Sequence, residues 1–481
     1  MPTSTFKSAK VCGGCHDAIY DQWTDSMHMR ALTSPLMIAE TNKAVRGPYA
    51  GVANPDPKRL CVNCHSPSAA RVTTSASIPL GDDSTLWREG INCQTCHQFA
   101  GAPTSGGGGY STGFMKGLAP GDTVFGGLTD PAPTSGHASA RADAFDRPNT
   151  MCGNCHNVHF DLDGDGRIEK GKDLVLQQTW DEYVTDYRDR GGEGTCISCH
   201  MPVVRGLARV TNDPSTPTRE VHDHSFFGVD YSLDDLAQRE ATRASRTALL
   251  REAARLQVDQ VTSTAGLVTF RVRITNASTG HNLPTGFAFV RQMWVEARAL
   301  DDAGVLVASS GLVASPDADL CEAEVLAEDS PLASFVRGCD GVDRSLVHFQ
   351  QKLVDRVRVA RVDGRVVRDA LDQPVLEGAR GSSEVLIQYL EGGPVARRRP
   401  SDGAALGLLR PFESRAFAYE LATGDATTRR LVVRLLFRNV APYFVRGLAA
   451  DAAKDVPNLA ELAKNLEIVE MASATIDVPP N

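Results

Sequence analysis

The chain has 481 residues, which is too long for one hydrophobic core and predicts two or three domains. Its formal net charge of −9 argues against nucleic acid as a partner, because a nucleic-acid-binding protein would carry a basic stripe. The sequence has no apolar run of about 18 residues or more. It therefore predicts a protein that does not span a membrane.

Ten of the twelve cysteines form five C-x-x-C pairs, and a histidine follows each pair directly. This pentapeptide is the attachment motif of c-type haem. Two thiols three residues apart on one helical turn can each form a thioether with a haem vinyl group, and the next imidazole then faces the iron. The predicted attachment residues are Cys12, Cys15, Cys61, Cys64, Cys93, Cys96, Cys152, Cys155, Cys196 and Cys199, and the predicted proximal iron ligands are His16, His65, His97, His156 and His200.

Two other uses of C-x-x-C pairs fit the pattern less well. A tetrahedral zinc site needs two pairs for each metal ion, so five pairs would leave one over, and zinc does not require a histidine after every pair. A redox-active dithiol of the thioredoxin type occurs once in a chain rather than five times. The sequence therefore predicts five covalently bound c-type haems.

The motifs also indicate where the protein works and how its first part is built. Covalent haem attachment takes place outside the cytoplasm, which predicts a periplasmic or extracellular protein. The chain reaches Cys12 without an apolar leader, so we expect a signal peptide to have been removed. All five motifs lie between residues 12 and 200, and this stretch is too short to build an aliphatic core around every haem. We expect a mainly helical, loop-rich pentahaem module at residues 1–231, with haem faces as its apolar interior.

The histidines outside the motifs are candidates for the second axial ligand of each iron. Seven of the twelve histidines remain, and five six-coordinate irons would use five of them. The segment around His28 reads as helix, and His137 stands at the expected start of another helix. His159 would share a helical face with His156 and reach a neighbouring haem. The predicted distal ligands are His28, His137, His159, His224 and His281.

Three of these seven histidines need a separate argument. His222 alternates with His224, so both would point to one side, and we expect only His224 to bind iron. His348 lies in a stretch that reads as a half-buried strand and is not expected to be a ligand. His281 lies on a loop of the β-rich second half, where a histidine is ordinarily exposed. Because spare histidines are few, we expect His281 to bind one iron and thereby attach the second half to the haem module.

A second metal signature follows the fourth motif. Asp161, Asp163, Asp165 and Gly166 match the first half of a calcium-binding loop, D-x-D-x-D-G. Lys172 stands where such a loop has its bidentate glutamate. Calcium and a tight acidic turn both remain open interpretations.

The character of the sequence changes after residue 231. Residues 232–257 read as one connecting helix, with Ser232 as its cap and Asp235 in the capping-box position. Period-2 runs then predict strands at residues 267–276, 292–300, 356–362, 384–390, 415–421 and 430–438, with an Asp-Gly hairpin at 361–366. The predicted fold class is α+β, with an antiparallel β-sandwich domain at residues 258–481 that ends with a short helix near 458–466. Cys321 and Cys339 lack haem spacing and are expected to form a disulfide.

Several phrases resemble one superfamily of multihaem c-type cytochromes, which includes the tetrahaem cytochrome of ammonia oxidisers, hydroxylamine oxidoreductase and pentahaem nitrite reductase. The phrases cover residues 12–32, 195–202, 222–228 and 279–287. The resemblance implies that His28, His224 and His281 are distal ligands and that the haems form stacked and edge-on pairs. Pentahaem nitrite reductase carries a C-x-x-C-K catalytic haem, whereas all five motifs here end in histidine. This departure argues against nitrite reduction.

The favoured function is electron transfer through five haems with two histidine ligands each, between redox partner proteins or small redox mediators. One alternative is an oxidoreductase, in which one haem lacks a distal ligand and acts on a small nitrogen or sulfur compound. A third hypothesis is a subunit of an extracellular cytochrome filament or larger oligomer, in which a neighbouring chain supplies one distal histidine. No catalytic residue is predicted.

Overall fold

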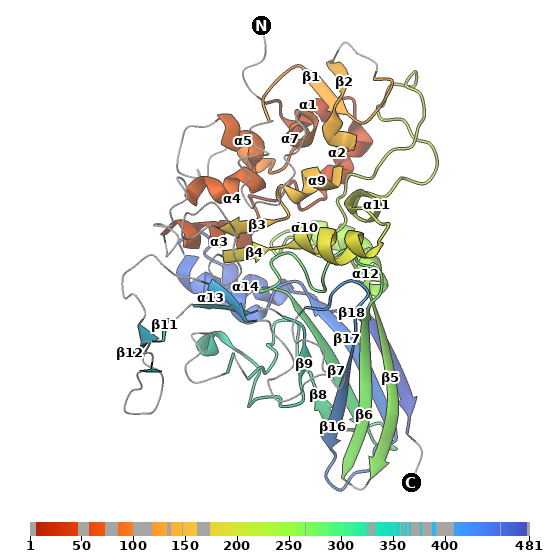
Figure 1. Cartoon of the computed structure of the whole chain (residues 1–481), viewed down its shortest axis with the longest axis vertical. Helices are drawn as coiled ribbons and strands as arrows, with labels where there is room; N and C mark the ends of the chain where they lie inside the picture. The colour runs from red at the N-terminus through yellow and green to blue at the C-terminus, as the bar shows by residue number, and fades with distance from the viewer. Residues whose placement is uncertain are drawn as a thin grey trace.

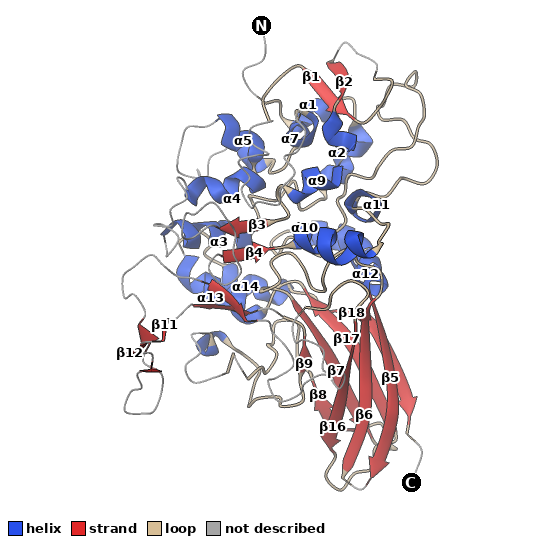
Figure 2. Cartoon of the chain, viewed as in Figure 1, coloured by secondary structure: helices blue, strands red, loops and turns tan. Residues whose placement is uncertain are grey.

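The computed structural model describes residues 6–46, 57–72, 85–99, 118–131, 136–146, 148–160, 174–264, 266–323, 325–326, 332–350, 408–452 and 454–478, together with short strands within 352–390. Most helices lie in the upper part of the molecule, and the long strands extend below them (Figure 1, Figure 2). Among the described residues, no helix is long and apolar enough to cross a membrane.

Short helices dominate the N-terminal part of the chain, and each C-x-x-C-H motif lies on a helix or directly follows one. In the first and fourth motifs, the amide N–H groups of Cys15 and Cys155 continue the turn by donating to the carbonyl oxygens of Cys12 and Cys152, both at 3.1 Å. The helices are α1 (Ala9–Gly13), α2 (Asp17–Thr24), α3 (Pro35–Arg46), α4 (Pro57–His65), α5 (Pro67–Val72), α6 (Thr85–Arg88), α7 (Cys93–His97), α9 (Pro148–Gly153), α10 (Thr179–Glu182) and α11 (Cys196–His200).

Shorter elements connect these helices. Strand β1 pairs with β2 in parallel, and β3 pairs with β4 antiparallel. These elements are β1 (Thr123–Gly126), β2 (Ala138–Arg141), β3 (Val158–Phe160), β4 (Leu174–Gln177), the 3-10 helices η2 (Asp143–Asp146) and η4 (Arg188–Arg190), and the π-helical turn η3 (Tyr183–Tyr187).

Two larger antiparallel sheets make up the second part. One has the order β16-β6-β5, and the other has the order β18-β17-β7-β8, with β9 also paired to β7. Their strands are β5 (Ala254–Thr264), β6 (Leu267–Asn276), β7 (Gln292–Leu300), β8 (Leu306–Ser310), β9 (Val347–His348), β16 (Ser414–Ala422), β17 (Arg430–Arg438) and β18 (Val469–Asp477). The predicted strands 267–276, 292–300 and 430–438 match β6, β7 and β17 residue for residue.

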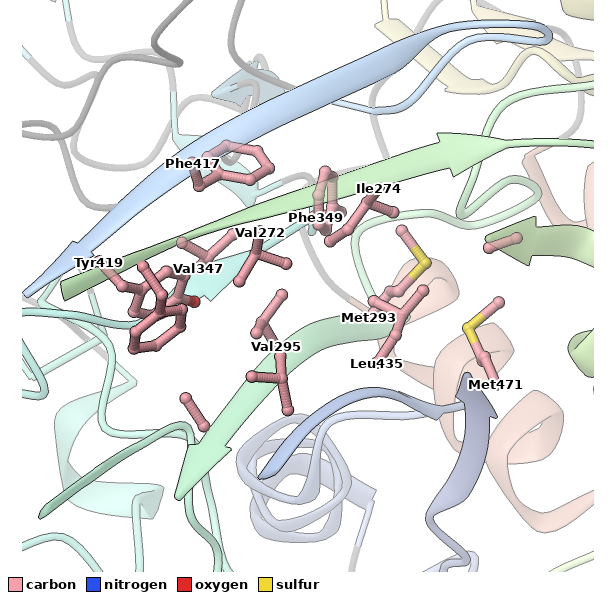
Figure 3. Packing of buried hydrophobic residues seen from close by; sticks show 14 of the residues in the cluster. Val272, Ile274, Met293, Val295, Val347, Phe349, Phe417, Tyr419, Leu435 and Met471 are labelled. Atoms are coloured by element: carbon pink, nitrogen blue, oxygen red, sulfur yellow. The ribbon is translucent and has the colours of Figure 1, made fainter. Parts of the chain in front are cut away.

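The alternation of apolar residues explains how the two sheets share one core. Along β6, Val268, Phe270, Val272 and Ile274 are buried, while the residues between them are half-buried. Apolar residues of β7, β16, β17 and β18 join them in a single cluster (Figure 3). The labelled members are Val272, Ile274, Met293, Val295, Val347, Phe349, Phe417, Tyr419, Leu435 and Met471.

The remaining strands are short and lie between residues 352 and 390. The antiparallel pairing of the hairpin predicted at residues 361–366 is confirmed, because Arg361–Val362 (β12) pairs with Arg365–Val366 (β13); Asp363 and Gly364 themselves lie outside the described residues. The other pairs are β10 (Lys352–Asp355) with β15 (Ile387–Leu390) and β11 (Arg358–Val359) with β14 (Leu376–Glu377). Within the predicted strands 356–362 and 384–390, residues 358–359, 361–362 and 387–390 are strand, and the others lie outside the described residues.

The connecting helix is shorter than the sequence predicts. Helix α12 covers Leu236–Ala253, and β5 begins at the next residue. Asp235 caps the helix by accepting from Gln238 N, whereas the Ser232 hydroxyl donates to Asp234. The expectation for residues 254–257 was wrong because these residues pair with β6, and sheet pairing outweighs their local helical preference.

The buried face of α12 is not purely apolar. Leu236 is 50% exposed, while Arg246 is only 3% exposed. The Arg246 guanidinium donates to Glu467 at 2.5 Å and lies 4.3 Å from the ring of Tyr231. A paired charge therefore replaces an apolar contact where the helix meets the C-terminal segment.

The two ends of the chain meet in a second hydrophobic cluster. Ala39 of α3 packs there with Val445 and Leu448 of α13 (Pro442–Ala452), and Figure 1 shows the two helices next to each other. The C-terminal helix predicted near 458–466 is present as α14 (Leu459–Leu462) followed by the 3-10 turn η6 (Ala463–Asn465). Helix α13, strand β18 and the 3-10 turn η5 (Ala333–Phe335) had no sequence prediction.

The disulfide predicted between Cys321 and Cys339 is present and spans 18 residues of sequence. A loop of this length restricts the unfolded chain enough to contribute about 3 kcal/mol to stability. We therefore predict that the double variant Cys321→Ser, Cys339→Ser lowers the free energy of unfolding by about this amount, as measured by urea unfolding followed by far-UV circular dichroism. An unchanged unfolding midpoint would contradict the prediction.

Candidate functional site

A cavity of about 2090 Å³ lies among the N-terminal helices, and all fifteen cysteines and histidines of the five motifs line it. Protein interiors are close-packed, and voids much larger than a water molecule are rare in them. A space of this size therefore requires a large guest. The donor set of thiols and imidazoles fits c-type haem, whose thioethers and iron bonds use these side chains.

Four of the five motif histidines have their Nδ1 atom next to a backbone carbonyl oxygen. A carbonyl oxygen can only accept, so Nδ1 carries the proton and Nε2 keeps its lone pair for a metal. Such bonds also fix the orientation of the ring. The acceptors are Val210 O for His16 (2.6 Å), Ala31 O for His65 (2.6 Å), Phe125 O for His97 (2.7 Å) and Phe227 O for His200.

The fifth motif histidine, His156, has a side-chain partner instead. Its Nδ1 lies 3.2 Å from the amide of Gln177, at the end of β4. Rotating that amide by half a turn places its oxygen next to Nδ1 as an acceptor. Gln177 had no signal in the sequence, because only the fold brings β4 next to the fourth motif.

Three predicted distal histidines lie opposite three motif histidines. Two imidazoles bound to one metal ion from opposite sides, each at about 2 Å, have ring centres about 6 Å apart. The structure shows this spacing three times. The pairs are His16 with His137, His156 with His28, and His200 with His281, each with ring centroids 6.3 Å apart.

Burial keeps five imidazoles of the cavity neutral, which is the state that binds a metal. Desolvation lowers the pKa of His28 to about 3 and the pKa of His156 and of His281 to about 4. Burial lowers the pKa of His65 and His97 as well. None of these five rings is therefore charged at pH 7.

His224 lies near the third motif. Burial, followed by the influence of His97, lowers the pKa of His224 to about 4. The Nδ1 atom of His224 donates to the carbonyl oxygen of His222 at 2.8 Å, which leaves its Nε2 available. His222 is exposed, and its own Nδ1 donates to Met201 O at 2.6 Å. His224 thus remains the better candidate of the two for an iron ligand.

The local structure around two distal candidates differs from the sequence prediction. His28 lies in turns after α2 and not on a helix, and Gly90 packs against its backbone at φ 53°, where a Cβ atom would be 2.4 Å from His28 O. His137 precedes strand β2 and not a helix. In both places a contact with a distant segment determines the backbone conformation, so the helices predicted from local propensity do not form.

The other predictions have different outcomes. The backbone of His159 belongs to β3, so the shared helical face with His156 was wrong, and its side chain lies outside the described residues. Asp161, Asp163 and Asp165 also lie outside the described residues, so the calcium interpretation stays a prediction. His348 is a strand residue, as expected, but it is fully buried in the sheet part and lies 3.8 Å from Glu322.

Cysteines of different motifs lie next to each other. Three pairs of these thiols lie close enough to shift each other's pKa: Cys12 with Cys93, Cys64 with Cys155, and Cys152 with Cys196. The third motif also meets the fourth, because Cys96 acts electrostatically on both Cys152 and Cys155. The five motifs therefore form one connected series inside the cavity.

A buried carboxylate holds the first motif against the third. Glu89 accepts from the Ser8 hydroxyl and from Ala9 N at the start of α1, the latter at 2.9 Å. The same side chain accepts from Asn92 Nδ2 at 3.2 Å, and Asn92 caps α7. One side chain thus fixes the beginnings of two motif helices, which explains the contact between Cys12 and Cys93.

The loop that carries His281 is held by Glu182 of α10. Glu182 accepts from the hydroxyl of Thr285 at 2.5 Å and from Asn282 N at 3.2 Å. Asn276 Nδ2 donates to the carbonyl oxygen of His281 at 2.9 Å. This loop therefore has a defined position relative to α10, although it belongs to the segment between β6 and β7.

Glu182 gives a pH-dependent prediction. Burial raises its pKa from 4.5 to about 7. An acid with a raised pKa holds its proton more tightly in the folded state, so its contribution to stability is full below pH 4.5 and is lost as the pH rises through about 7. Over that range we expect the wild type to lose about 3 kcal/mol of unfolding free energy relative to Glu182→Gln, as measured by denaturant unfolding at a series of pH values. Parallel pH profiles of the two proteins would contradict this prediction.

Comparisons with known proteins agree with the site. A sequence model of the family described as cytochrome c554 and c-prime matches residues 11–98, which contain the first three motifs and His28. The fold is similar to that of a penta-heme cytochrome c552 from Thermochromatium tepidum, with a TM-score of 0.55, 19% sequence identity and coverage of 98% of this chain and 99% of that chain. No curated protein matches the chain. Residues 11–98 are thus similar to a cytochrome family, and the whole chain shares its fold with a solved penta-heme cytochrome.

Proposed function

We propose that the protein binds five covalent haems, each with two histidine ligands, and relays electrons between redox partners in the periplasm or outside the cell. The observation that carries this proposal is the threefold recurrence of a motif histidine with a second imidazole at 6.3 Å. By elimination among the remaining histidines, we assign His224 to His97, which acts on it electrostatically, and His159 to His65. Bis-histidine iron is six-coordinate and suits one-electron transfer, because no position is open to a substrate.

The contacts between motifs support an order for the relay. The haem of Cys12 and Cys15 meets the haem of Cys93 and Cys96, which in turn meets the haem of Cys152 and Cys155. The second and fifth haems also meet the fourth, through Cys64 and Cys196. The fourth haem is then the junction of the relay. An electron that enters at the first haem can then leave through the second haem or the fifth haem.

The sheet part has a role in this proposal as well. Its two sheets share one hydrophobic core, which is what a β-sandwich requires, and we infer that residues 258–481 form such a domain after the haem module at 1–231 and the connecting segment 232–257. The domain supplies His281 to the fifth haem. We infer that it is a permanent wall of the haem cavity. The redox partners are then proteins or small mediators that approach the opposite, motif-rich side.

One observation favours a second candidate function. In the described part of the chain, no histidine ring lies at 6.3 Å from His65, unlike His16, His156 and His200. If His159 does not close this iron, the second haem has an open position. The protein would then be an oxidoreductase acting on a small ligand at that haem.

Two measurements test the number of haems and their coordination. Intact-mass determination is expected to give the polypeptide plus five haems, because every motif has both cysteines. Carbon monoxide is expected not to bind the reduced protein, since each iron has two imidazoles. A mass with fewer haems would overturn the pentahaem proposal, and carbon monoxide binding would favour the oxidoreductase.

His281→Ala tests the distal ligands directly. We predict that it leaves one of five irons high-spin in the ferric electron paramagnetic resonance spectrum, because His281 is the only described imidazole 6.3 Å from His200. His222→Ala serves as the matched control, because His222 is exposed and lies on a neighbouring loop. A fully low-spin spectrum for His281→Ala, or an equal high-spin fraction in both variants, would refute the assignment.

A further inference from the structure

A buried polar corner lies where the sheet part meets the haem cavity. Arg291 precedes β7, is 8% exposed and lines the cavity together with Asp230 and Asn439. Its two terminal nitrogens donate to the two carboxylate oxygens of Asp230, at 2.5 and 2.7 Å, and one of them also donates to Asn439 O at 2.9 Å. Both terminal nitrogens of the guanidinium are therefore hydrogen-bonded within the protein.

The Nε–H group of the same guanidinium, on its side edge, has no acceptor in the described part of the protein. Arg291 Nε is buried and has no hydrogen-bond partner among the described residues. A buried charged donor without an acceptor costs more free energy than an ordinary hydrogen bond contributes, so native proteins rarely leave one unpaired. An acceptor that the polypeptide does not supply is therefore expected at this edge.

Other cations that line the cavity differ from Arg291 in this respect. Within the described ranges these cations are Lys7, Arg30, Arg219 and Arg246, and none has a buried nitrogen without a partner. Arg30 is paired with Asp235, and Arg246 is paired with Glu467. Among the described cations that line the cavity, Arg291 is thus the one with a buried N–H group that needs an acceptor from the molecule in the cavity.

The chemistry of that molecule follows from the proposed haems. The anionic groups of a haem are its two propionates, and a carboxylate is the acceptor that an arginine edge binds best. The Asp230 carboxylate lies within electrostatic range of His156, so we take the fourth haem as the partner of this corner. His156 is the proximal ligand predicted for the fourth haem.

We propose that Arg291 binds a propionate of the fourth haem through its Nε–H, with Asp230 holding the guanidinium in place. This inference rests on the proposed function. Arg291 is then a positioning and charge-balancing residue at the junction of the relay. A positive charge next to a propionate offsets its field at the iron, and this favours the ferrous form of that haem.

Charge changes of opposite sign test the proposal by potentiometric titration of the holoprotein. Arg291→Gln removes a positive charge, so the reduction potential of one haem is expected to fall. Asp230→Asn removes a negative charge, so the potential of the same haem is expected to rise. Arg291→Lys keeps the positive charge but lacks the Nε–H donor. Its reduction potential is therefore expected to lie between those of Arg291→Gln and the wild type. The affected haem should be the one that His28→Ala converts to high spin, because His28 lies opposite His156.

Arg243→Gln is the matched control, because Arg243 carries the same charge on the exposed side of α12 and does not line the cavity. A titration of Arg291→Gln that matches the wild type, or that matches Arg243→Gln, would overturn the proposal. Intact mass and the low-spin spectrum are recorded first for every variant. A failure of those two measurements in the wild type counts against the five-haem function, whereas an absent potential shift in a fully loaded protein counts against Arg291 alone.

Discussion

The hydrogen bond from a motif histidine to a backbone carbonyl oxygen is the constraint on which the site depends. His16 donates to Val210 O across 194 residues of sequence, and three other motif histidines do the same with residues 27 to 34 positions away. Each bond fixes a tautomer and aims Nε2 into the cavity. The loops of the first part therefore have irregular backbones but defined positions, since their carbonyl groups orient the imidazoles that are proposed to bind iron.

The sheet part contributes two groups to the same cavity. The loop between β6 and β7 carries His281 and is held by Glu182, and the start of β7 carries Arg291. The shared core of the two sheets gives these side chains a rigid support, and β7 is the strand that leads from that core to the cavity wall. The long strands matter for function because a distal ligand is useful only if its distance from the iron is fixed.

The features that could be predicted from the sequence are those with a local physical cause. Strands β6, β7 and β17 alternate apolar and polar residues, so their ends were predicted to the residue. The Asp-Gly hairpin at 361–366 follows from turn geometry alone. Helix α12 was predicted to continue four residues too far at its C-terminal end, because pairing of β5 with β6 depends on a partner strand that local propensity does not contain. The strand after His137 was missed for the same reason, since β2 exists only through its contact with β1.

By itself, the sequence determined the chemistry: five C-x-x-C-H motifs specify covalent haem, and the few spare histidines identify the candidates for the second ligand. The tertiary structure decided which imidazole faces which. His16 is opposite His137 and His200 is opposite His281, and no spacing rule links these residues because their partners are brought together by loops, sheet edges and buried carboxylates. It also placed Gln177 and Arg291 at the cavity and Glu182 against the loop that carries His281. A ligand pair is a relation between distant segments, so only the folded chain specifies it.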